Sequence, residues 1–283
     1  MTKHPCCAEL RLLAPTRTAA RVILRADMQG MASEPVGDGL WEALLGGDPA
    51  VRRAAPLYGA LLDAADAATR APAGSFVLGR LAQSLDGCIA TASGHSFWIS
   101  GEADVRHTHR LRALSDAVVV GAGTIRADDP QLTTRNCRGP SPVRVVIDTE
   151  RRLAPHYRVF NGGPATLLLC AADAPGGAAG DAELLRLPRG AAGLDIAAII
   201  AALHGRGLRR IYVEGGGVTV SRFLAAGGLD RLHVTIAPVL LGAGIPAFSL
   251  PGVAHPRDGL RLDWTVHRLG EDILFDIPLE RRV

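Results

Sequence analysis

The stretch VVVGAGTIRADDPQLTTR, residues 118–135, decides the fold prediction for this chain. It begins as a buried strand of valines and continues through a turn of small residues into a short helix. A strand that opens through glycines into a helix leaves backbone N–H groups free, and an anionic ligand can bind there. Asp128, Asp129 and Arg135 add charge at the same rim, which a structural turn does not need. We therefore expect a ligand site here, with a turn that serves packing alone as the alternative.

The composition is that of a globular protein that is long for a single domain. The chain has 283 residues, of which 48% are hydrophobic and 21% charged, so it can bury a full core. No apolar run approaches the roughly 18 residues that a membrane span requires, and the N-terminus lacks a basic and then apolar signal sequence. We expect a cytoplasmic protein without membrane contact.

The basic residues argue against several function classes. Lys3 is the only lysine, so nearly all of the 31 basic residues are arginines. A Walker-type phosphate loop or a Schiff-base mechanism needs a lysine inside the fold. Scattered arginines with few aromatic residues form neither a basic stripe nor a stacking platform for nucleic acids. The arginines are expected to bind small phosphates or to coat the surface.

The cysteines and histidines do not form a metal-binding pattern. The five cysteines are odd in number and show no C-x-x-C spacing. The adjacent Cys6 and Cys7 are not followed by a second ligand pair at finger-like spacing. His107 and His109 lie two apart on a predicted helix and therefore point to different faces. We expect no metal.

The chain is predicted to divide into an N-terminal extension, residues 1–74, and an α/β domain, residues 75–283. The extension is rich in Ala and Arg and is expected to be partly helical, at residues 40–45 and 54–68, or disordered. A further hypothesis for this segment is that translation begins at Met28 or Met31. Residues 72–75, Pro-Ala-Gly-Ser, are predicted to be a linker.

From residue 76 onward the predicted strands and helices alternate. Strands are expected at residues 76–83, 117–120, 143–147, 166–170 and 211–213, and helices at 101–114, with Ser100 as N-cap, 195–204 and 219–226. This alternation predicts a largely parallel sheet with helices on both faces. Apolar residues alternate at 260–266 and again at 273–279, which predicts an antiparallel β-hairpin at the sheet edge. The expected fold is therefore α/β with a mixed, mainly parallel sheet.

A second candidate site is IYVEGGGVTVSR, residues 211–222, which leads from a strand through a glycine triplet into a helix. N–H groups at this helix start suit a pyrophosphate. The spacing is not G-x-G-x-x-G, so the standard NAD fingerprint matches poorly. Glu214 lies at the carboxyl end of a buried strand, where a carboxylate is costly unless it is paired or used. Close packing of the helix on the strand is the alternative explanation of the glycines.

A third segment, residues 81–100, leaves the first strand through Asp86-Gly87 and reaches the next helix. Together the three segments resemble the reductase domain of the bacterial riboflavin-biosynthesis deaminase–reductase, whose fold is dihydrofolate reductase-like. The resemblance covers residues 76–279. It rests on the motifs S-L-D-G, S-x-W-I-S, V-G-A-G-T, A-D-D-P-x-L-T-x-R, V-I-D-T and V-E-G-G in family order.

The resemblance implies NADPH-dependent reduction of 5-amino-6-(5-phosphoribosylamino)uracil to its ribitylamino product, with hydride transfer to the sugar C1′. It implies NADPH contacts for Ala82, Trp98, Thr124, Asp128, Thr149, Gly216, Gly217, Val218, Thr219, Val220, Ser221 and Arg222. It implies substrate contacts for Ser96, Arg112, Leu132, Arg135 and Glu214. Glu214 and Asp128 are the expected catalytic residues, and which of them donates the proton stays open. A homodimer is also implied.

Two departures from the family pattern leave alternatives open. Residues 1–75 contain no H-x-E with P-C-x-x-C, so zinc-dependent deamination is not expected. Phe97 stands where some relatives carry a polar or basic residue beside the substrate. The alternatives are a reductase of a related pterin or pyrimidine and a nucleotide-binding protein that has lost turnover.

Overall fold

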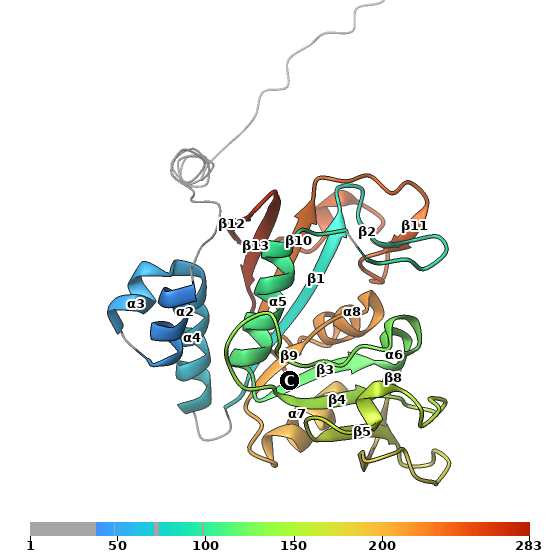
Figure 1. Cartoon of the computed structure of the whole chain (residues 1–283). Helices are drawn as coiled ribbons and strands as arrows, with labels where there is room; N and C mark the ends of the chain where they lie inside the picture. Colours follow the sequence, from blue (N-terminus) through green and yellow to red (C-terminus); the bar gives the residue numbers. More distant parts are fainter. Residues whose placement is uncertain (1–37, 48, 71–73, 98) are drawn as a thin grey trace, which may run out of the picture. The chain divides into compact units, whose positions relative to one another are not determined.

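The computed structural model describes residues 38–47, 49–70, 74–97 and 99–283 (Figure 1). The described residues form one compact unit. The predictions made for Met28, Met31 and Trp98 lie outside the described residues, as does the part of the predicted extension before residue 38.

The described residues contain a nine-stranded sheet with the strand order β12-β13-β10-β1-β9-β3-β4-β5-β6. Its strands are β1 (Phe76–Ser84), β3 (Ala117–Gly121), β4 (Val143–Ile147), β5 (Thr166–Ala171), β6 (Glu183–Leu187), β9 (Arg210–Val213), β10 (Arg231–Ala237), β12 (Thr265–Leu269) and β13 (Asp272–Pro278). Pairing is parallel from β10 to β6, whereas β13 pairs antiparallel with both β10 and β12. The predicted mixed, mainly parallel sheet with a C-terminal antiparallel hairpin is confirmed.

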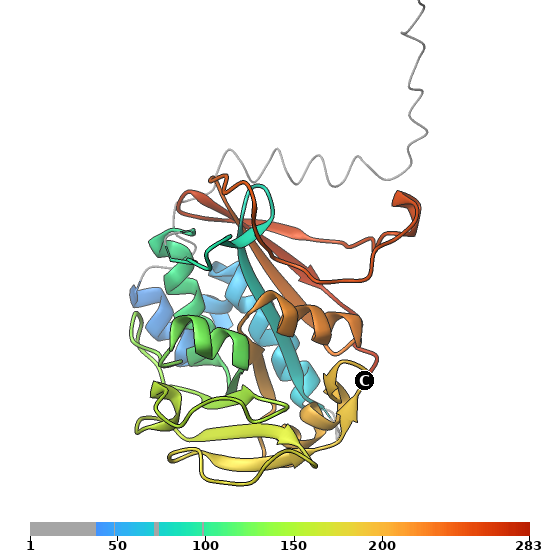
Figure 2. The same cartoon turned by 90° about the vertical axis from the view of Figure 1, so that its right-hand side faces the viewer.

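Helices cover both faces of this sheet (Figures 1 and 2). They are α2 (Asp38–Leu45), α3 (Pro49–Ala54), α4 (Pro56–Arg70), α5 (Glu102–Leu114), α6 (Ala122–Asp128), α7 (Ile196–His204) and α8 (Gly217–Ala225), with 3-10 turns at Arg158–Phe160 and Pro256–Asp258. Successive side chains of a strand point to opposite faces. Val118 and Val120 therefore join the core that contains α4 and α5, and Val119 joins the core that contains α7 and α8. Burial on both faces explains the continuous valine run of β3.

Two short ribbons stand outside the main sheet. The strand β2 (Cys88–Thr91) pairs antiparallel with β11 (Gly244–Pro246), and β7 (Arg189–Gly190) pairs antiparallel with β8 (Gly193–Leu194). The β2–β11 ribbon lies beyond the carboxyl ends of β1 and β10 (Figure 1). The Asp86 carboxylate accepts hydrogen bonds from the backbone N–H groups of Leu241 and Gly242, which joins the two connections that enter the ribbon.

The structure corrects two local predictions. The N-cap of α5 is Gly101 rather than Ser100, and no side chain caps it. The Gly101 N–H donates instead to the Asp272 carboxylate of the hairpin at 2.8 Å, a partner distant in sequence. The first hairpin strand begins only at Thr265, so the apolar alternation from Leu260 to Trp264 lies outside it. Leu260 and Trp264 are exposed, and Trp264 meets the Phe275 ring edge-on, so only Leu262 of this alternation packs against the core.

The helices before residue 74 share the core of the α/β domain. Trp41 of α2 and Tyr58 of α4 are almost fully buried, and their rings meet edge-on at 5.4 Å. The Arg110 guanidinium of α5 lies over both rings, at 5.1 and 5.6 Å. Leu57 and Leu61 of α4 are buried in this core as well. The boundary at residue 74 remains a prediction, while residues 38–70 pack into the core that β1 and α5 supply.

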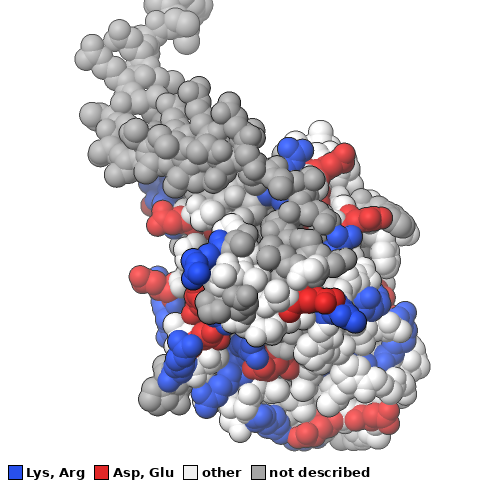
Figure 3. Space-filling model, turned by 60° about the vertical axis from the view of Figure 1, so that its left-hand side comes forward, with Lys and Arg blue, Asp and Glu red and all other residues white. Residues whose placement is uncertain are grey.

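One face of the molecule, shown in Figure 3, carries basic and acidic side chains side by side. Ion pairs of this kind among the described residues include Arg52 with Asp66, at 2.9 Å, and Arg138 with Glu42, at 2.8 Å. Mixed charges of this type keep a surface solvated, and each exposed pair contributes little stability.

A buried histidine pair predicts that acid destabilises the fold. His107 lies 2.8 Å from the Tyr58 hydroxyl and 3.2 Å from a ring nitrogen of His233. Burial lowers the pKa of both histidines, and for His107 the neighbouring His233 and Arg80 lower it further. Both rings are then neutral in the fold, whereas the unfolded chain takes up protons below about pH 6.5. Stability is therefore lost as pH falls below that value, by at most about 1.4 kcal/mol per pH unit for each histidine.

Thermal unfolding between pH 7 and pH 5 tests this expectation. The melting temperature should fall with pH, and the His107→Gln variant should show a shallower dependence. The exposed His156, which stacks on Tyr157, offers His156→Gln as a matched control with the wild-type slope. A slope that is unchanged in His107→Gln would show that this histidine does not set the acid sensitivity.

Candidate functional site

A cavity of about 770 Å³ opens at the carboxyl ends of β1, β9, β3 and β4. Parallel strands present these ends at one edge of a sheet, which is where α/β proteins bind ligands. All three segments singled out in the sequence contribute to its wall. The predicted site residues that line it are Ala82, Ser96, Thr124, Asp128, Leu132, Thr149, Glu214, Gly216, Gly217, Val218, Thr219 and Arg222.

The two glycine turns form one side of the cavity and interlock. A Cβ atom at Gly121 would overlap the Thr219 hydroxyl, and one at Gly216 would lie 2.8 Å from the Thr124 hydroxyl. Gly215 has a φ of +80°, and a Cβ there would meet only open space. No side chain caps the N-terminus of α8. Its first-turn N–H groups therefore lack a side-chain acceptor beside the cavity, and an anionic group fits there.

Glu214 and Arg112 form a buried ion pair at the cavity floor. The Arg112 Nε donates to Glu214 Oε2 at 2.6 Å, and Nη2 donates to the other carboxylate oxygen. A third donor, Nη1, binds the Thr133 carbonyl at 2.7 Å. Burial lowers the pKa of Arg112, but the attraction of Glu214 outweighs it and raises the pKa above its ordinary value. Glu214 lines the cavity and Arg112 lies behind it, so the two predicted substrate contacts form one unit.

Asp128 occupies a different electrostatic environment. It lines the cavity, and the Ser96 hydroxyl donates to its Oδ1 at 3.2 Å. Burial raises the pKa of Asp128, and the Ser96 hydrogen bond opposes that shift. No arginine or histidine among the described residues lies within ion-pair distance of Asp128. Of the two predicted catalytic carboxyl groups, Asp128 is therefore the one whose surroundings favour the protonated form.

Several predicted site residues do not reach the cavity. On α8 the helical period turns Val220 and Ser221 toward the core, where both are buried. The Ser221 hydroxyl accepts a hydrogen bond from the Ser249 N–H at 2.8 Å, so it fixes the segment beyond β11 instead. Arg135 is outside the cavity lining and is exposed. Trp98 lies in the part of the chain that the structure leaves undescribed.

Arg135 belongs to a group of basic residues next to the cavity. Its backbone N–H donates to the His109 ring at 3.1 Å. Burial lowers the pKa of Arg135, and the positive charges of Arg112 and Arg158 lower it further. A concentration of positive charge of this kind attracts a phosphate.

Sequence reasoning missed Arg80, which lines the cavity from β1. Its guanidinium forms a buried ion pair with Asp104 of α5, which also accepts from the Thr235 hydroxyl at 2.7 Å. An arginine in the otherwise apolar segment 76–82 was the signal, because a buried strand carries a charge only where a partner exists. Sequence reasoning also missed Ile89 and Ile245 of the β2–β11 ribbon, which line the opposite wall.

No group of three or more His, Cys, Asp and Glu side chains in the described residues is arranged to hold a metal ion. None of the described helices has the length and apolarity needed to cross a bilayer.

The chain is similar to curated reductases of riboflavin biosynthesis. It is 37% identical over 216 residues to the 2,5-diamino-6-ribosylamino-4(3H)-pyrimidinone 5′-phosphate reductase of Methanothermobacter thermautotrophicus, covering 72% of this chain and 98% of that protein. It is 34% identical over 203 residues to the riboflavin biosynthesis protein RibD of Mycobacterium tuberculosis, covering 70% of this chain. The match spans about half of that RibD protein, 52% of its length.

Solved structures and a family model agree with these relatives. The deaminase/5-amino-6-(5-phosphoribosylamino)uracil reductase of Thermotoga maritima matches with a TM-score of 0.62 and 27% identity, over 72% of this chain and 56% of that one. RibD of Acinetobacter baumannii matches with a TM-score of 0.64 and 26% identity, over 74% and 59%. These structures confirm the predicted dihydrofolate reductase-like fold. The family model described as the RibD C-terminal domain matches residues 75–275, and the chain therefore belongs to the RibD C-terminal domain family.

Proposed function

We propose that this protein is an NADPH-dependent oxidoreductase of riboflavin biosynthesis. Its reaction converts the ribosylamino group of a 6-ribosylaminopyrimidine 5′-phosphate to a ribitylamino group. The observation that carries the proposal is one cavity that holds both an uncapped helix N-terminus and two carboxyl groups in different electrostatic environments. The relatives named as pyrimidine phosphate reductases support it.

The cavity wall fits a nicotinamide dinucleotide. The N–H groups of Gly217 and Val218 begin α8 at the cavity wall, which suits a pyrophosphate. The hydroxyls of Thr124 and Thr149 line the same cavity and can donate to phosphate or ribose oxygens. When bound, the cofactor supplies the hydride that the sugar C1′ receives.

Asp128 is the proposed proton donor. For C1′ to accept a hydride, the ribose ring must open, and the oxygen that leaves C1′ must take a proton. A carboxyl group whose pKa burial raises is better able to hold this proton in the cavity than an exposed one. The Ser96 hydroxyl fixes the carboxyl group by hydrogen bonding.

Glu214 has a positioning and binding role in this proposal. Arg112 fixes the orientation of its carboxylate through two hydrogen bonds. A carboxylate held in this way can accept hydrogen bonds from sugar hydroxyls or from pyrimidine N–H groups. Leu132 has a left-handed backbone, with a φ of +55°. Its side chain is buried and lines the cavity, so it excludes water from this region.

Two forms of the pyrimidine are candidates. The family resemblance implies the 5-aminouracil form, whereas the relative that the chain matches over 98% of its length is named for the 2,5-diaminopyrimidinone form. Oxidation of NADPH by the purified protein, followed by absorbance with each form and with dihydrofolate, tests the proposal. We expect turnover with at least one ribosylaminopyrimidine phosphate and none with dihydrofolate. Turnover with dihydrofolate alone would contradict the proposed substrate class.

Arg135 is expected to bind the substrate phosphate. The Arg135→Ala variant removes a cation from the group that includes Arg158. The loss of one charge-assisted contact should raise the KM for the phosphorylated substrate about tenfold to hundredfold. The affinity for NADPH should not change.

The phosphate-free nucleoside gives the control for this variant. Its KM should be the same in wild type and Arg135→Ala, because the contact that is lost involves only the phosphate. The Arg138→Ala variant, which removes a 78% exposed arginine paired with Glu42, should behave as wild type. An equal rise in KM for both substrates would assign Arg135 a structural role.

We also propose a cytoplasmic homodimer. Exposed apolar side chains support the dimer: Phe97 is 71% exposed and Val105 41% exposed. Both line one groove together with Pro238 and Val239.

A further inference from the structure

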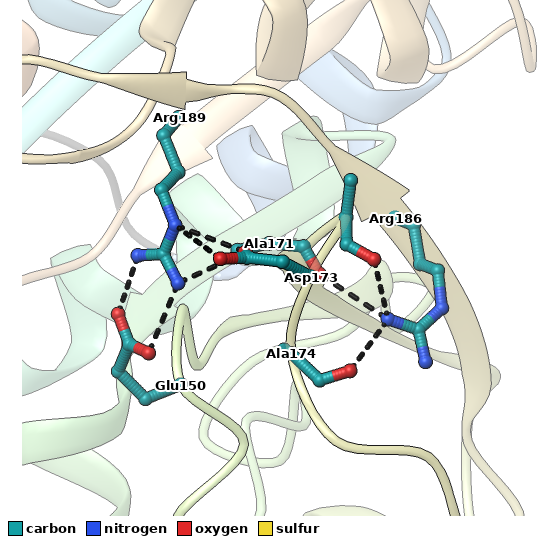
Figure 4. Close-up of polar contacts among 7 residues, drawn as sticks. Glu150, Ala171, Asp173, Ala174, Arg186 and Arg189 are labelled. Atoms are coloured by element: carbon teal, nitrogen blue, oxygen red, sulfur yellow. Dashed lines mark hydrogen bonds and ion pairs between the residues drawn. The ribbon is translucent and has the colours of Figure 1, made fainter.

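At the end of the cavity next to β4, an arginine outside the cavity lining binds a carboxylate of that lining. Glu150 follows β4 and lines the cavity, and Arg189 of β7 binds it with two donors, at 2.5 and 3.1 Å. The same guanidinium binds Asp173 at 3.0 Å, so it lies between two carboxylates (Figure 4). The hydrogen bonds from Arg189 lower the pKa of both acids.

The loop that carries Asp173 is itself anchored. One nitrogen of Arg186, on β6, donates to the carbonyl groups of Ala171, Ala172 and Ala174 (Figure 4). Arg186 thereby fixes the turn on which Asp173 stands, and Asp173 in turn orients Arg189. The arrangement is more than a single surface ion pair, because three charged residues, Asp173, Arg186 and Arg189, hold the Glu150 carboxylate in place.

Two arginines without such partners stand beside it. Arg152 and Arg222 both line the cavity, are exposed, and have no carboxylate within ion-pair distance among the described residues, although the charge of Arg152 also lowers the pKa of Glu150. The Arg222 guanidinium and the Thr149 hydroxyl lie close together, because both are next to Gly193. A Cβ atom at Gly193 would be 2.8 Å from Arg222 Nη1 and 3.4 Å from Thr149 Oγ1. This end of the cavity therefore presents two cations and a hydroxyl donor.

The charges next to the adenosine ribose distinguish NADPH from NADH in a dinucleotide site. In dinucleotide sites a carboxylate beyond a strand binds the 2′-hydroxyl of the adenosine ribose in NADH, and a nearby arginine accommodates the 2′-phosphate of NADPH. A cofactor with its pyrophosphate at the N-terminus of α8 and its nicotinamide near Asp128 would extend its adenosine toward Thr149 and Glu150, which follow β4 in the lining of the same cavity. A free Glu150 there would repel the 2′-phosphate.

The geometry points to Arg189 as the residue that sets NADPH preference, by holding Glu150 away from the site where Arg152 and Arg222 bind the 2′-phosphate. This inference rests on the proposed NADPH dependence and deepens it. Arg189 is a positioning residue, since it acts through Glu150 rather than on the cofactor.

Calorimetric titration of the full chain with 2′,5′-ADP and with 5′-ADP tests the inference without turnover. The Arg189→Ala variant should raise the Kd for 2′,5′-ADP about tenfold, because a free carboxylate then faces the phosphate. Its Kd for 5′-ADP, which lacks the 2′-phosphate, should stay within about twofold of wild type. The Arg152→Ala variant should weaken 2′,5′-ADP by at least about tenfold through loss of a direct contact.

A double variant distinguishes an effect of the Glu150 charge from a structural effect of the Arg189 substitution. The double variant Glu150→Gln/Arg189→Ala has no carboxylate to release, so its Kd for 2′,5′-ADP should return to within about threefold of wild type. The Arg206→Ala variant, which breaks the surface pair with Glu183, serves as the matched control and should bind both ligands as wild type does. Failure of the rescue, or equal weakening of both ligands by Arg189→Ala, would overturn the inference.

These outcomes are independent of the pyrimidine substrate. Tight, Arg189-dependent binding of 2′,5′-ADP in a protein that fails to reduce either ribosylaminopyrimidine would support this inference and reject the proposed substrate. A wild-type protein that turns over the substrate but binds 2′,5′-ADP and 5′-ADP equally would support the proposed substrate and reject this inference.

Discussion

The Asp128→Asn variant is expected to lose turnover by about 10²–10³-fold, while its affinity for NADPH stays within about threefold of wild type. An asparagine keeps the size of the side chain and can still accept from Ser96, but it cannot give up a proton. The cavity and the glycine turns remain intact, so binding of the cofactor should hardly change. Stopped-flow turnover and fluorescence titration with NADPH measure the two quantities separately.

The pH profile distinguishes a proton donor from a binding residue. A donor must be protonated, so kcat should fall as pH rises through the pKa of Asp128, a pKa that burial raises. The Ser96 hydrogen bond lowers that pKa, so Ser96→Ala should raise it and move this limb of the profile to higher pH. In Asp128→Asn the limb should disappear.

The neighbouring carboxylate supplies a matched control. Asp129 lies outside the cavity lining, accepts from the Arg158 N–H at 2.8 Å, and has a left-handed backbone, with φ +39°, that asparagine also adopts. Asp129→Asn should therefore keep turnover within about twofold. Equal losses in the two variants would show that Asp128 acts through the fold and would remove it from the mechanism.

The Glu214→Gln variant is expected to destabilise the protein by about 3 kcal/mol. It removes the counter-charge of Arg112, whose side chain is only 7% exposed, and leaves a buried cation with a neutral partner. Turnover should fall as well, because Glu214 lines the cavity, while NADPH affinity should change little. Urea unfolding of the variant and of wild type gives the difference in stability.

A double-mutant cycle isolates the charge effect. Arg112→Met/Glu214→Gln removes both charges, so it should be more stable than Glu214→Gln alone. The exposed pair of Arg206 and Glu183 is the comparison, and Glu183→Gln should change stability by less than about 0.5 kcal/mol. If the double variant were as unstable as the sum of the two single variants, the pair would not be coupled.

Local sequence signals predicted the elements that frame the site. The strand β4 spans the predicted residues 143–147, and the helix predicted at 195–204 begins one residue later, with Asp195 as its N-cap. These predictions succeed because burial period and capping are properties of neighbouring residues. The strands β2, β6 and β11 were missed, because short strands at the edges are defined by pairing partners far along the chain.

The sequence by itself determined the βα turns at Gly121 and Gly215, the run of buried valines, and the carboxyl groups that follow them, because each depends on local conformation or on residue type. Only the tertiary structure decided which charges surround those carboxyl groups. Arg112 and Glu214 are 102 positions apart, and their pairing arises because α5 and β9 pack together. Asp128, on α6, has no cation within ion-pair distance among the described residues, and a separate contact holds Glu150 to Arg189. The charge state of a carboxyl group depends on what surrounds it in space, which the order of residues along the chain does not specify.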